Sequence, residues 1–186
     1  GDVIAVAPES ARSGMSHAIT IKEPLRIKKL RDEPGIKVYK CNGTPVDCVK
    51  LGLDQLVDRT PNYILSGINH GSNAGISVLY SGTMGAAIEG GLHGIPSIGF
   101  SLLDHHPDAD FTLAVEVVKE LFQSFMKQPR NTVLKVNIPN IPADKCKGYK
   151  VCKQTNGVWK GDFEKREDPS GREYYWLTGY FDNFEV

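Results

Sequence analysis

The sequence lacks the long apolar runs that would mark a membrane protein. Apolar residues make up 40% of its 186 residues, but no stretch approaches the roughly 18 consecutive apolar residues that a transmembrane helix needs. The first residues, Gly1 to Pro8, lack the cationic start and the cleavage site of a signal peptide. We therefore expect a cytoplasmic protein that has no membrane partner.

An excess of charge of one sign is also missing. Lysine and arginine together number 22, as do aspartate and glutamate, so the formal net charge is zero. Proteins that bind nucleic acids usually carry a basic excess, and we therefore expect no nucleic-acid partner. The basic residues between Lys22 and Arg31 form one local cluster, which we interpret as a solvated face.

Cysteines are few, and their spacing is uninformative. Cys41, Cys48, Cys146 and Cys152 match neither a zinc ribbon nor a redox Cys-x-x-Cys pair, so we expect reduced, partly buried thiols. The sequence also has no dinucleotide fingerprint, no P-loop, no His-Glu-x-x-His and no Gly-x-Ser-x-Gly elbow. None of these familiar catalytic classes is indicated.

One polar segment, Asp104 to Asp110, combines aspartates with two adjacent histidines and could hold a metal ion. The alternative is a polar loop that caps the helix after it, with Asp108 or Asp110 at the N-cap. We favour the cap.

What the sequence does contain is an alternation of strand and helix patterns. Val3 to Ala7 is an apolar run typical of a buried parallel strand. Thr44 and Pro45 are typical of a helix start, as N-cap and first-turn residue. This alternation predicts βαβ units, a parallel sheet and an α/β fold. We predict strands at 3–7, 63–65, 96–100 and 133–138, and helices over 45–56, 84–92 and 111–127.

Beyond Pro142 the pattern changes to strands at 150–154, 158–165 and 172–178, with a turn at 168–171. We predict a core over residues 1–142 and a β-rich arm over residues 143–186. Aromatic residues are enriched at interfaces, so we expect the arm to pair with a second subunit in a two-fold dimer. The alternative is an arm that folds back on its own sheet. The aromatic residues of the arm are Tyr149, Trp159, Phe163, Tyr174, Tyr175, Trp176, Tyr180, Phe181 and Phe184.

Three loops, at 7–14, 66–75 and 80–85, follow strands or lead into a helix, where α/β sheets bind ligands. Free amides at a helix start favour phosphate, although Ser81-Gly82-Thr83 is also explained by simple helix capping. We predict no regular secondary structure in the second loop, and long irregular loops are uncommon in compact domains unless they are functional. Asparagine and serine oxygens suit magnesium, manganese or calcium, but Glu9 is the only carboxylate in the three loops.

Several motifs together resemble the SurE family of survival proteins. They occur in the family's order along nearly the whole chain. The matching stretches are Val6-Ala7-Pro8, Arg12-Ser13-Gly14, Ser16-His17, Gly43-Thr44-Pro45-Val46-Asp47-Cys48-Val49, Ser66-Gly67-Ile68-Asn69, Tyr80-Ser81-Gly82-Thr83-Met84-Gly85-Ala86-Ala87, Ile95-Pro96-Ser97-Ile98, Phe100-Ser101, Val136-Asn137-Ile138-Pro139 and Leu177-Thr178-Gly179.

The resemblance implies a Rossmann-like three-layer fold and a phosphatase that hydrolyses nucleoside 5′- and 3′-monophosphates. It implies one divalent cation per subunit, Mg²⁺ or Mn²⁺, and a homodimer or a tetramer of dimers. In the family, two consecutive aspartates, the serine of Arg-Ser-Gly and the asparagine of Ser-Gly-Ile-Asn hold the metal. The implied metal ligands here are Ser13 and Asn69, and the implied phosphate-pocket residues are Asn73, Ser81, Gly82 and Thr83.

The aspartate pair does not occur in this sequence. Family members carry it on a strand that ends in Asn-Asp-Asp-Gly, followed by a helix, before the point that Gly1 matches, a stretch of about 30 residues. The leading hypothesis is a metal-dependent 5′-nucleotidase whose general base or nucleophile stays unassigned. The alternative is a non-catalytic nucleotide-binding or regulatory module without the metal carboxylates. A structural subunit that assembles through the arm is compatible with both.

Overall fold

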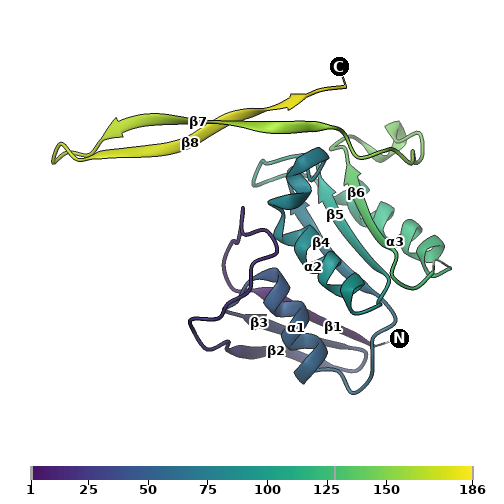
Figure 1. The fold of residues 1–186 in the computed structure, drawn as a ribbon. Coiled ribbons are helices and arrows are strands. Elements are labelled where there is room, and N and C mark those ends of the chain that lie inside the picture. The colour runs from purple at the N-terminus through teal and green to yellow at the C-terminus, as the bar shows by residue number, and fades with distance from the viewer. Residues whose placement is uncertain (1, 128, 186) are drawn as a thin grey trace.

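The structure is a computed structural model that describes residues 2–127 and 129–185 (Figure 1). Strands and helices alternate through the first three quarters of the chain, and a hairpin follows. The elements are β1 Val3–Pro8, β2 Ile27–Glu33, β3 Ile36–Cys41, α1 Pro45–Gln55, β4 Ile64–His70, the 3-10 helix η1 Gly75–Leu79, α2 Gly82–Leu92, β5 Ser97–Leu102, α3 Thr112–Phe125, β6 Val133–Ile138, the 3-10 helix η2 Ala143–Lys145, β7 Gly157–Glu167 and β8 Glu173–Asn183.

The core strands form two three-stranded sheets. In the first, the order is β1-β3-β2, with β1 parallel to β3 and β2 antiparallel at the edge. In the second, β4, β5 and β6 are all parallel, with β5 in the middle. Within the described residues no ladder of hydrogen bonds joins the two sheets. The prediction of an α/β fold with mostly parallel strands is confirmed.

Helices cover both faces of the β4-β5-β6 sheet. Gly99 lies so close to Met84 that α2 must cover its face of β5. Neighbouring residues of a strand point to opposite faces, so Phe100 faces the other side. There it belongs to a buried cluster with Val117 of α3. α1 packs beside α2, so these two helices form one layer (Figure 1). The strands form the second layer and α3 the third, as predicted.

The two crossovers of this sheet have opposite hands. The chain passes from β4 to β5 and from β5 to β6 in the same direction across the sheet. The first step runs through α2 on one face, and the second runs through α3 on the other face. One of the two must therefore be left-handed, a connection that parallel sheets rarely use.

The main core lies between β5 and α3. Every residue of β5 is buried, because helices cover it on both sides. The side chains of Ile98, Phe100 and Leu102 meet the apolar stripe of α3, whose residues recur at three- and four-residue steps as the sequence predicts. Burying a large apolar side chain stabilises the fold by about 1.5–3 kcal/mol.

The start of α1 follows the predicted capping pattern. Thr44 is the N-cap, Pro45 opens the first turn, and the Thr44 hydroxyl accepts a hydrogen bond from the Asp47 amide. The Asp47 carboxylate accepts from the Thr44 amide in return, which completes a capping box. It also accepts from the amide and hydroxyl of Thr20, so α1 holds the middle of the long loop between β1 and β2.

The C-terminal arm is a two-stranded hairpin that projects beyond the body of the molecule (Figure 1). At its base, the Phe181 ring packs on Gly75 of η1, where a Cβ atom would lie 2.7 Å from the ring. Farther out, the cross-strand pair Phe163 and Leu177 lies on the same face as Phe181, because alternate residues share a face. The predicted hairpin arm is confirmed.

Some predicted details are wrong. Residues 150–154 form no strand, and the hairpin strands are longer than predicted. β2 and β3 were not predicted. Part of the basic cluster lies in β2, and its charged residues interrupt the alternation of apolar and polar residues that would indicate a strand. The N-cap of α3 is Phe111, not Asp108 or Asp110, although Asp110 accepts hydrogen bonds from the amide and hydroxyl of Thr112.

Candidate functional site

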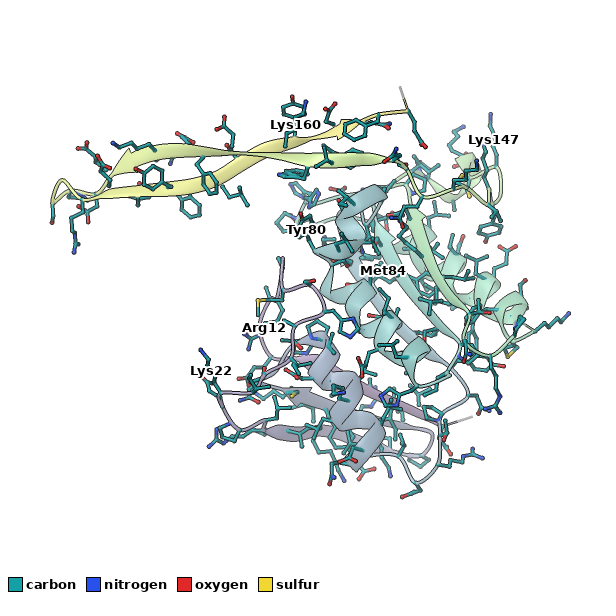
Figure 2. All side chains as sticks on the ribbon, viewed as in Figure 1. Arg12, Lys22, Tyr80, Met84, Lys147 and Lys160 are labelled. Carbon is teal, nitrogen blue, oxygen red and sulfur yellow. The ribbon has the colours of Figure 1, made fainter. Side chains whose placement is uncertain are left out.

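The loop after β1 lies against the N-terminus of α2. The Ser16 amide donates to the Tyr80 carbonyl at 3.1 Å, and the Ser16 hydroxyl donates to the Leu79 carbonyl. A Cβ atom on Gly82 would lie 3.7 Å from the Arg12 carbonyl. Figure 2 marks the two segments with the labels Arg12 and Tyr80. Segments about 70 residues apart in the sequence therefore form one wall of the site.

Ser13 is exposed on a turn of this loop, and Gly14 follows it with φ +73. Within the described residues no hydrogen bond engages the Ser13 hydroxyl, so its oxygen is free for a ligand. The residue before it is firmly held. Arg12 Nη2 donates to the Asn42 carbonyl at 2.5 Å, and its Nε is buried without a partner in the described part of the chain.

The segment Ser81-Gly82-Thr83 begins α2. Ser81 is the N-cap, and its hydroxyl accepts from the Met84 amide at 3.1 Å, so the capping interpretation is correct for this hydroxyl. Gly82 is required for packing, because a Cβ atom there would lie 2.9 Å from the Pro45 ring. The Thr83 hydroxyl makes no hydrogen bond to the described residues. The first-turn amides and Thr83 are the groups left for an anion.

Asn69 lies inside β4, not in a long irregular loop. The strand continues to His70, with an irregularity between Ser66 and Asn69, and η1 begins at Gly75. The predicted loop therefore shrinks to a short turn, and its length no longer indicates function. Asn69 Nδ2 donates to the carbonyls of His70 and Gly71 at 2.9 and 3.0 Å. This orients the amide and leaves Oδ1 without a hydrogen bond to the described residues.

Asn73 is held more tightly than the sequence suggested. Its side chain is 4% exposed, and Nδ2 donates to the Ser101 hydroxyl at 2.5 Å. Its backbone amide donates to Asn137 Oδ1 at 3.0 Å. Ser101 and Asn137, at the ends of β5 and β6, were not predicted as site residues. Polar side chains at the carboxyl ends of two buried strands were the available signal.

The segment Asp104 to Asp110 also lies at this end of the sheet. The His105 ring packs directly on Gly71, where φ is +90 and no side chain would fit. Asp104 accepts from the His106 amide at 2.7 Å and from Asn140 Nδ2 at 2.5 Å. Within residues 2–127 and 129–185, no three His, Cys, Asp or Glu side chains are placed to hold a metal ion together.

The predicted site residues thus fall into two groups. Ser81, Gly82 and Thr83 form one group with the turn that carries Ser13, because Gly82 lies next to Arg12. Asn69 and Asn73 form the second group, at the end of β4 and in the turn after it. No hydrogen bond between described residues joins the two groups. Both lie where strands end and α2 begins.

Two cysteines are buried, and the surroundings of Cys48 make its thiol unreactive. Cys41 and Cys48 are both free and buried. Burial, followed by the neighbouring Cys41, raises the pKa of Cys48 to about 12. The reactive species of a cysteine is the thiolate, so Cys48 stays in the unreactive thiol form at neutral pH.

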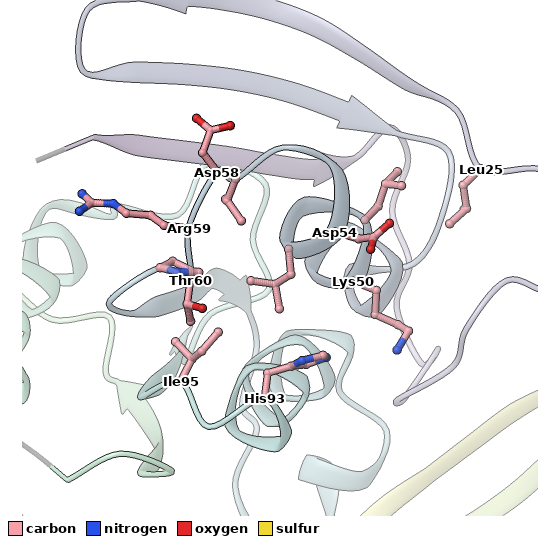
Figure 3. Close-up of a pocket in the computed structure, with 12 residues that line it drawn as sticks. Leu25, Lys50, Asp54, Asp58, Arg59, Thr60, His93 and Ile95 are labelled. Atoms are coloured by element: carbon pink, nitrogen blue, oxygen red, sulfur yellow. The ribbon is translucent and has the colours of Figure 1, made fainter.

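A surface groove of about 750 Å³ lies at the C-terminal ends of α1 and α2, away from the N-terminus of α2 (Figure 3). Lys50 and His93 line it, together with the loop that connects α1 to β4. The groove contains none of the residues that the sequence analysis assigned to the site. It is separate from the candidate site.

Comparison with known proteins gives the family. The model of the survival protein SurE matches residues 1–161. The chain belongs to the SurE family. It is 50% identical over 187 aligned residues to the 5′-nucleotidase SurE of Christiangramia forsetii, covering 98% of this chain and 72% of that protein. The 5′-nucleotidase SurE of Phocaeicola vulgatus is 46% identical, with 100% and 72% covered.

The SurE fold is also found in a solved structure. The crystal structure of the SurE protein from Aquifex aeolicus superposes with a TM-score of 0.75 at 35% identity, over 94% of this chain and 70% of that one. The predicted resemblance to SurE proteins is therefore confirmed. None of the helices in the described part of the chain has the length and apolar content needed to cross a membrane.

Proposed function

We propose that this SurE-family chain acts as a 5′-nucleotidase that hydrolyses nucleoside 5′- and 3′-monophosphates to nucleoside and phosphate. Family membership supports the proposal, as do the relatives named 5′-nucleotidase SurE. The observation that carries it in the structure is the meeting of the Ser13 turn with the N-terminus of α2. A helix N-terminus with free amides is suited to a phosphate group.

The proposal includes one divalent cation, Mg²⁺ or Mn²⁺. Ser13 and Asn69 fit such an ion in their chemistry, because each has an oxygen free of hydrogen bonds to the described residues and hard cations prefer oxygen ligands. Asn69 also fits in its orientation, since two carbonyls hold its Nδ2. Two neutral oxygens make a weak site, so the proposal requires the aspartate pair that the resemblance implies and this sequence does not contain.

The chain's own residues would bind and orient the substrate. Amides in the first turn of α2 and the Thr83 hydroxyl would donate to the phosphate oxygens and stabilise charge that develops on them. Asn73, fixed by Ser101 and Asn137, would form the facing wall of the pocket. When bound, the cation would supply charge neutralisation and an activated water.

A phosphate-release assay on full-length protein that carries the aspartate pair, over nucleoside monophosphates with Mg²⁺ or Mn²⁺ and then with EDTA, tests the function. We expect activity that the chelator abolishes and that Asn69→Ala reduces at least a hundredfold, because direct metal ligands are rarely replaceable. Asn62→Ala changes an exposed asparagine outside the site and serves as the matched control. Full turnover by Asn69→Ala, or activity that survives chelation, would contradict the metal mechanism.

The same assay distinguishes the second candidate, a nucleotide-binding module without catalysis. Its supporting observation is the lack of a carboxylate cluster at the site among the described residues. Saturable binding of a nucleoside monophosphate, with no phosphate released at any metal concentration tested, would favour the module.

We also infer that the arm pairs with a second copy of the chain, and that the protein resides in the cytoplasm. Free cysteines support the location.

Phe163 and Leu177 support the pairing of the arm with a second copy, because they are 64% and 63% exposed on the apolar face of the hairpin. Light scattering tests the pairing: Leu177→Ser should lower the mass toward that of one chain. Thr178→Ser, on the opposite face, should not. A wild-type protein already monomeric at micromolar concentration would refute it.

A further inference from the structure

Glu89 is a buried carboxylate in an otherwise apolar part of α2. It is 6% exposed and lies among Met84, Ala86 and Ala87, which are also buried. A carboxylate taken out of water loses several kcal/mol of hydration unless charged partners compensate. An ionisable residue in this place therefore requires an explanation, and the proposed chemistry does not use it.

Three basic side chains from three parts of the chain surround this carboxylate. His17 Nε2, from the loop after β1, donates to Oε2 at 2.7 Å. Lys50 Nζ, from α1, donates to Oε1 at 3.1 Å. His93 Nε2, at the end of α2, contacts Oε1 at 3.2 Å. Glu89 thus links α2 to its neighbouring helix and to the loop that carries Ser13.

Glu89 is charged at neutral pH despite its burial. Burial alone would raise the pKa of its carboxyl group, but hydrogen bonds from His17, Lys50 and His93 outweigh this effect and lower the pKa. A charge-assisted hydrogen bond is about twice as strong as a neutral one. The contact from His17 has the shortest distance of the three, and it is the one that engages the loop.

Arg12 holds the residue before Ser13 to the Asn42 carbonyl, and two residues after Ser13 attach the loop to α2 and to the segment that leads into it. Ser16 bonds to the backbone of Leu79 and Tyr80 at one end of α2. His17 bonds to Glu89, two helical turns farther along. Two attachments at separate points fix the direction in which a segment leaves a surface, whereas one attachment permits rotation. With the other end of the turn held by Arg12, the pair His17 and Glu89 sets how the turn at Ser13 approaches the start of α2 from the His17 side.

We propose that Glu89 and His17 are positioning residues that hold the turn at Ser13 beside the N-terminus of α2. The inference rests on the proposed function in one respect, that the Ser13 hydroxyl is a ligand of the divalent cation. Neither residue touches the substrate in this proposal. They act through the backbone of residues 13–17. Loss of the contact between His17 and Glu89 would therefore displace the Ser13 hydroxyl first.

The matched variants are His17→Ala and His93→Ala. Each removes one histidine partner of Glu89, but only His17 belongs to the loop. Two quantities are measured on each variant of the full-length protein that carries the aspartate pair. The first is the rate of hydrogen–deuterium exchange in residues 11–17, and the second is the dissociation constant of Mn²⁺ alone, measured by electron paramagnetic resonance. His17→Ala should speed exchange in residues 11–17 and weaken Mn²⁺ binding by about tenfold, the lower range for loss of a residue that supports a metal ligand. His93→Ala should leave both close to wild type.

The conservative variant His17→Gln separates positioning from bulk stability. Glutamine keeps a donor for the Glu89 carboxylate, so exchange and Mn²⁺ affinity should both return toward wild type. Equal effects of His17→Ala and His93→Ala, or unchanged exchange in His17→Ala, would overturn the proposal. Faster exchange without a change in Mn²⁺ affinity would keep the positioning role and reject Ser13 as a ligand. A wild-type protein that binds no Mn²⁺ would reject the proposed metal chemistry, and exchange alone would then decide the positioning role.

Discussion

The body and the arm of this protein use apolar side chains in opposite ways. In the body, Phe100 is 2% exposed and packs between a sheet and a helix. In the arm, Phe163 and Leu177 are mostly exposed on a hairpin that touches the body at its base. The body therefore stabilises itself, whereas the arm contributes an apolar surface with little effect on its own fold. Four substitutions test this difference, from the largest effect on unfolding free energy to the smallest.

Phe100→Ala should have the largest effect. It empties a position enclosed by β5 and α3, and removal of a buried phenylalanine costs about 3–5 kcal/mol. Urea denaturation followed by circular dichroism measures the loss. A loss below 1 kcal/mol would mean that the core between β5 and α3 contributes less than its burial implies.

Asp47→Asn should cost about 1.5–3 kcal/mol at neutral pH, the usual range for a hydrogen bond to a charged group. Burial would raise the pKa of Asp47, but hydrogen bonds from the Thr20 hydroxyl and the amides of Thr44 and Thr20 lower it below the usual value. A lowered pKa means that the carboxylate stabilises the fold above its unfolded pKa, and that this contribution disappears as pH falls through the folded pKa. The gap between wild type and variant should therefore narrow in acid. A constant gap would contradict the charged role.

Lys135→Met should stabilise the protein modestly, by about 1 kcal/mol. The Lys135 ammonium is buried without a hydrogen-bond partner among the described residues, and burial lowers its pKa. The charged form is thus less favourable in the folded chain than in water, and methionine has similar length without the charge. Thermal unfolding of both proteins measures the difference. A lower Tm in the variant would show that Lys135 has a partner in the assembled protein.

Leu177→Ser should have the smallest effect on the unfolding of a single chain, within about 0.5 kcal/mol, as for other exposed positions. The reason is that Leu177 is 63% exposed, although its side chain is apolar. Urea denaturation at low protein concentration isolates this contribution from assembly. A cost like that of Phe100→Ala would mean that the arm packs on the body of its own chain.

The sequence predicted regular elements where local signals and burial agree. The capping residues of α1 and the apolar stripe of α3 are such cases, because both patterns are local and strong. It failed where tertiary pairing overrides local pattern. β2 begins within the basic cluster from Lys22 to Arg31, which was interpreted as a solvated face, and its partner β3 was not predicted. β4 extends through a glycine-rich stretch that was predicted as a loop.

The candidate site was predictable by residue type but not by its supports. Ser13, Asn69 and Ser81 stood out through motifs. Asn69 is held by its neighbours in the chain, but other supports of the site are distant in sequence. Asn137 meets Asn73 across 64 positions, and Glu89 meets His17 across 72. Such pairs depend on the strand order and on the placement of α2, which no local pattern encodes. A single acid within an apolar helix was the one available hint of Glu89.

The short sequence separation of the paired core strands has a consequence for how the chain folds. All ladders of the first sheet lie within residues 3–41, and those of the second lie within residues 64–138. Pairing partners that are close in sequence lose little chain entropy when they meet, so such units form early. We expect each half to acquire its own strand order before α1 and α2 dock.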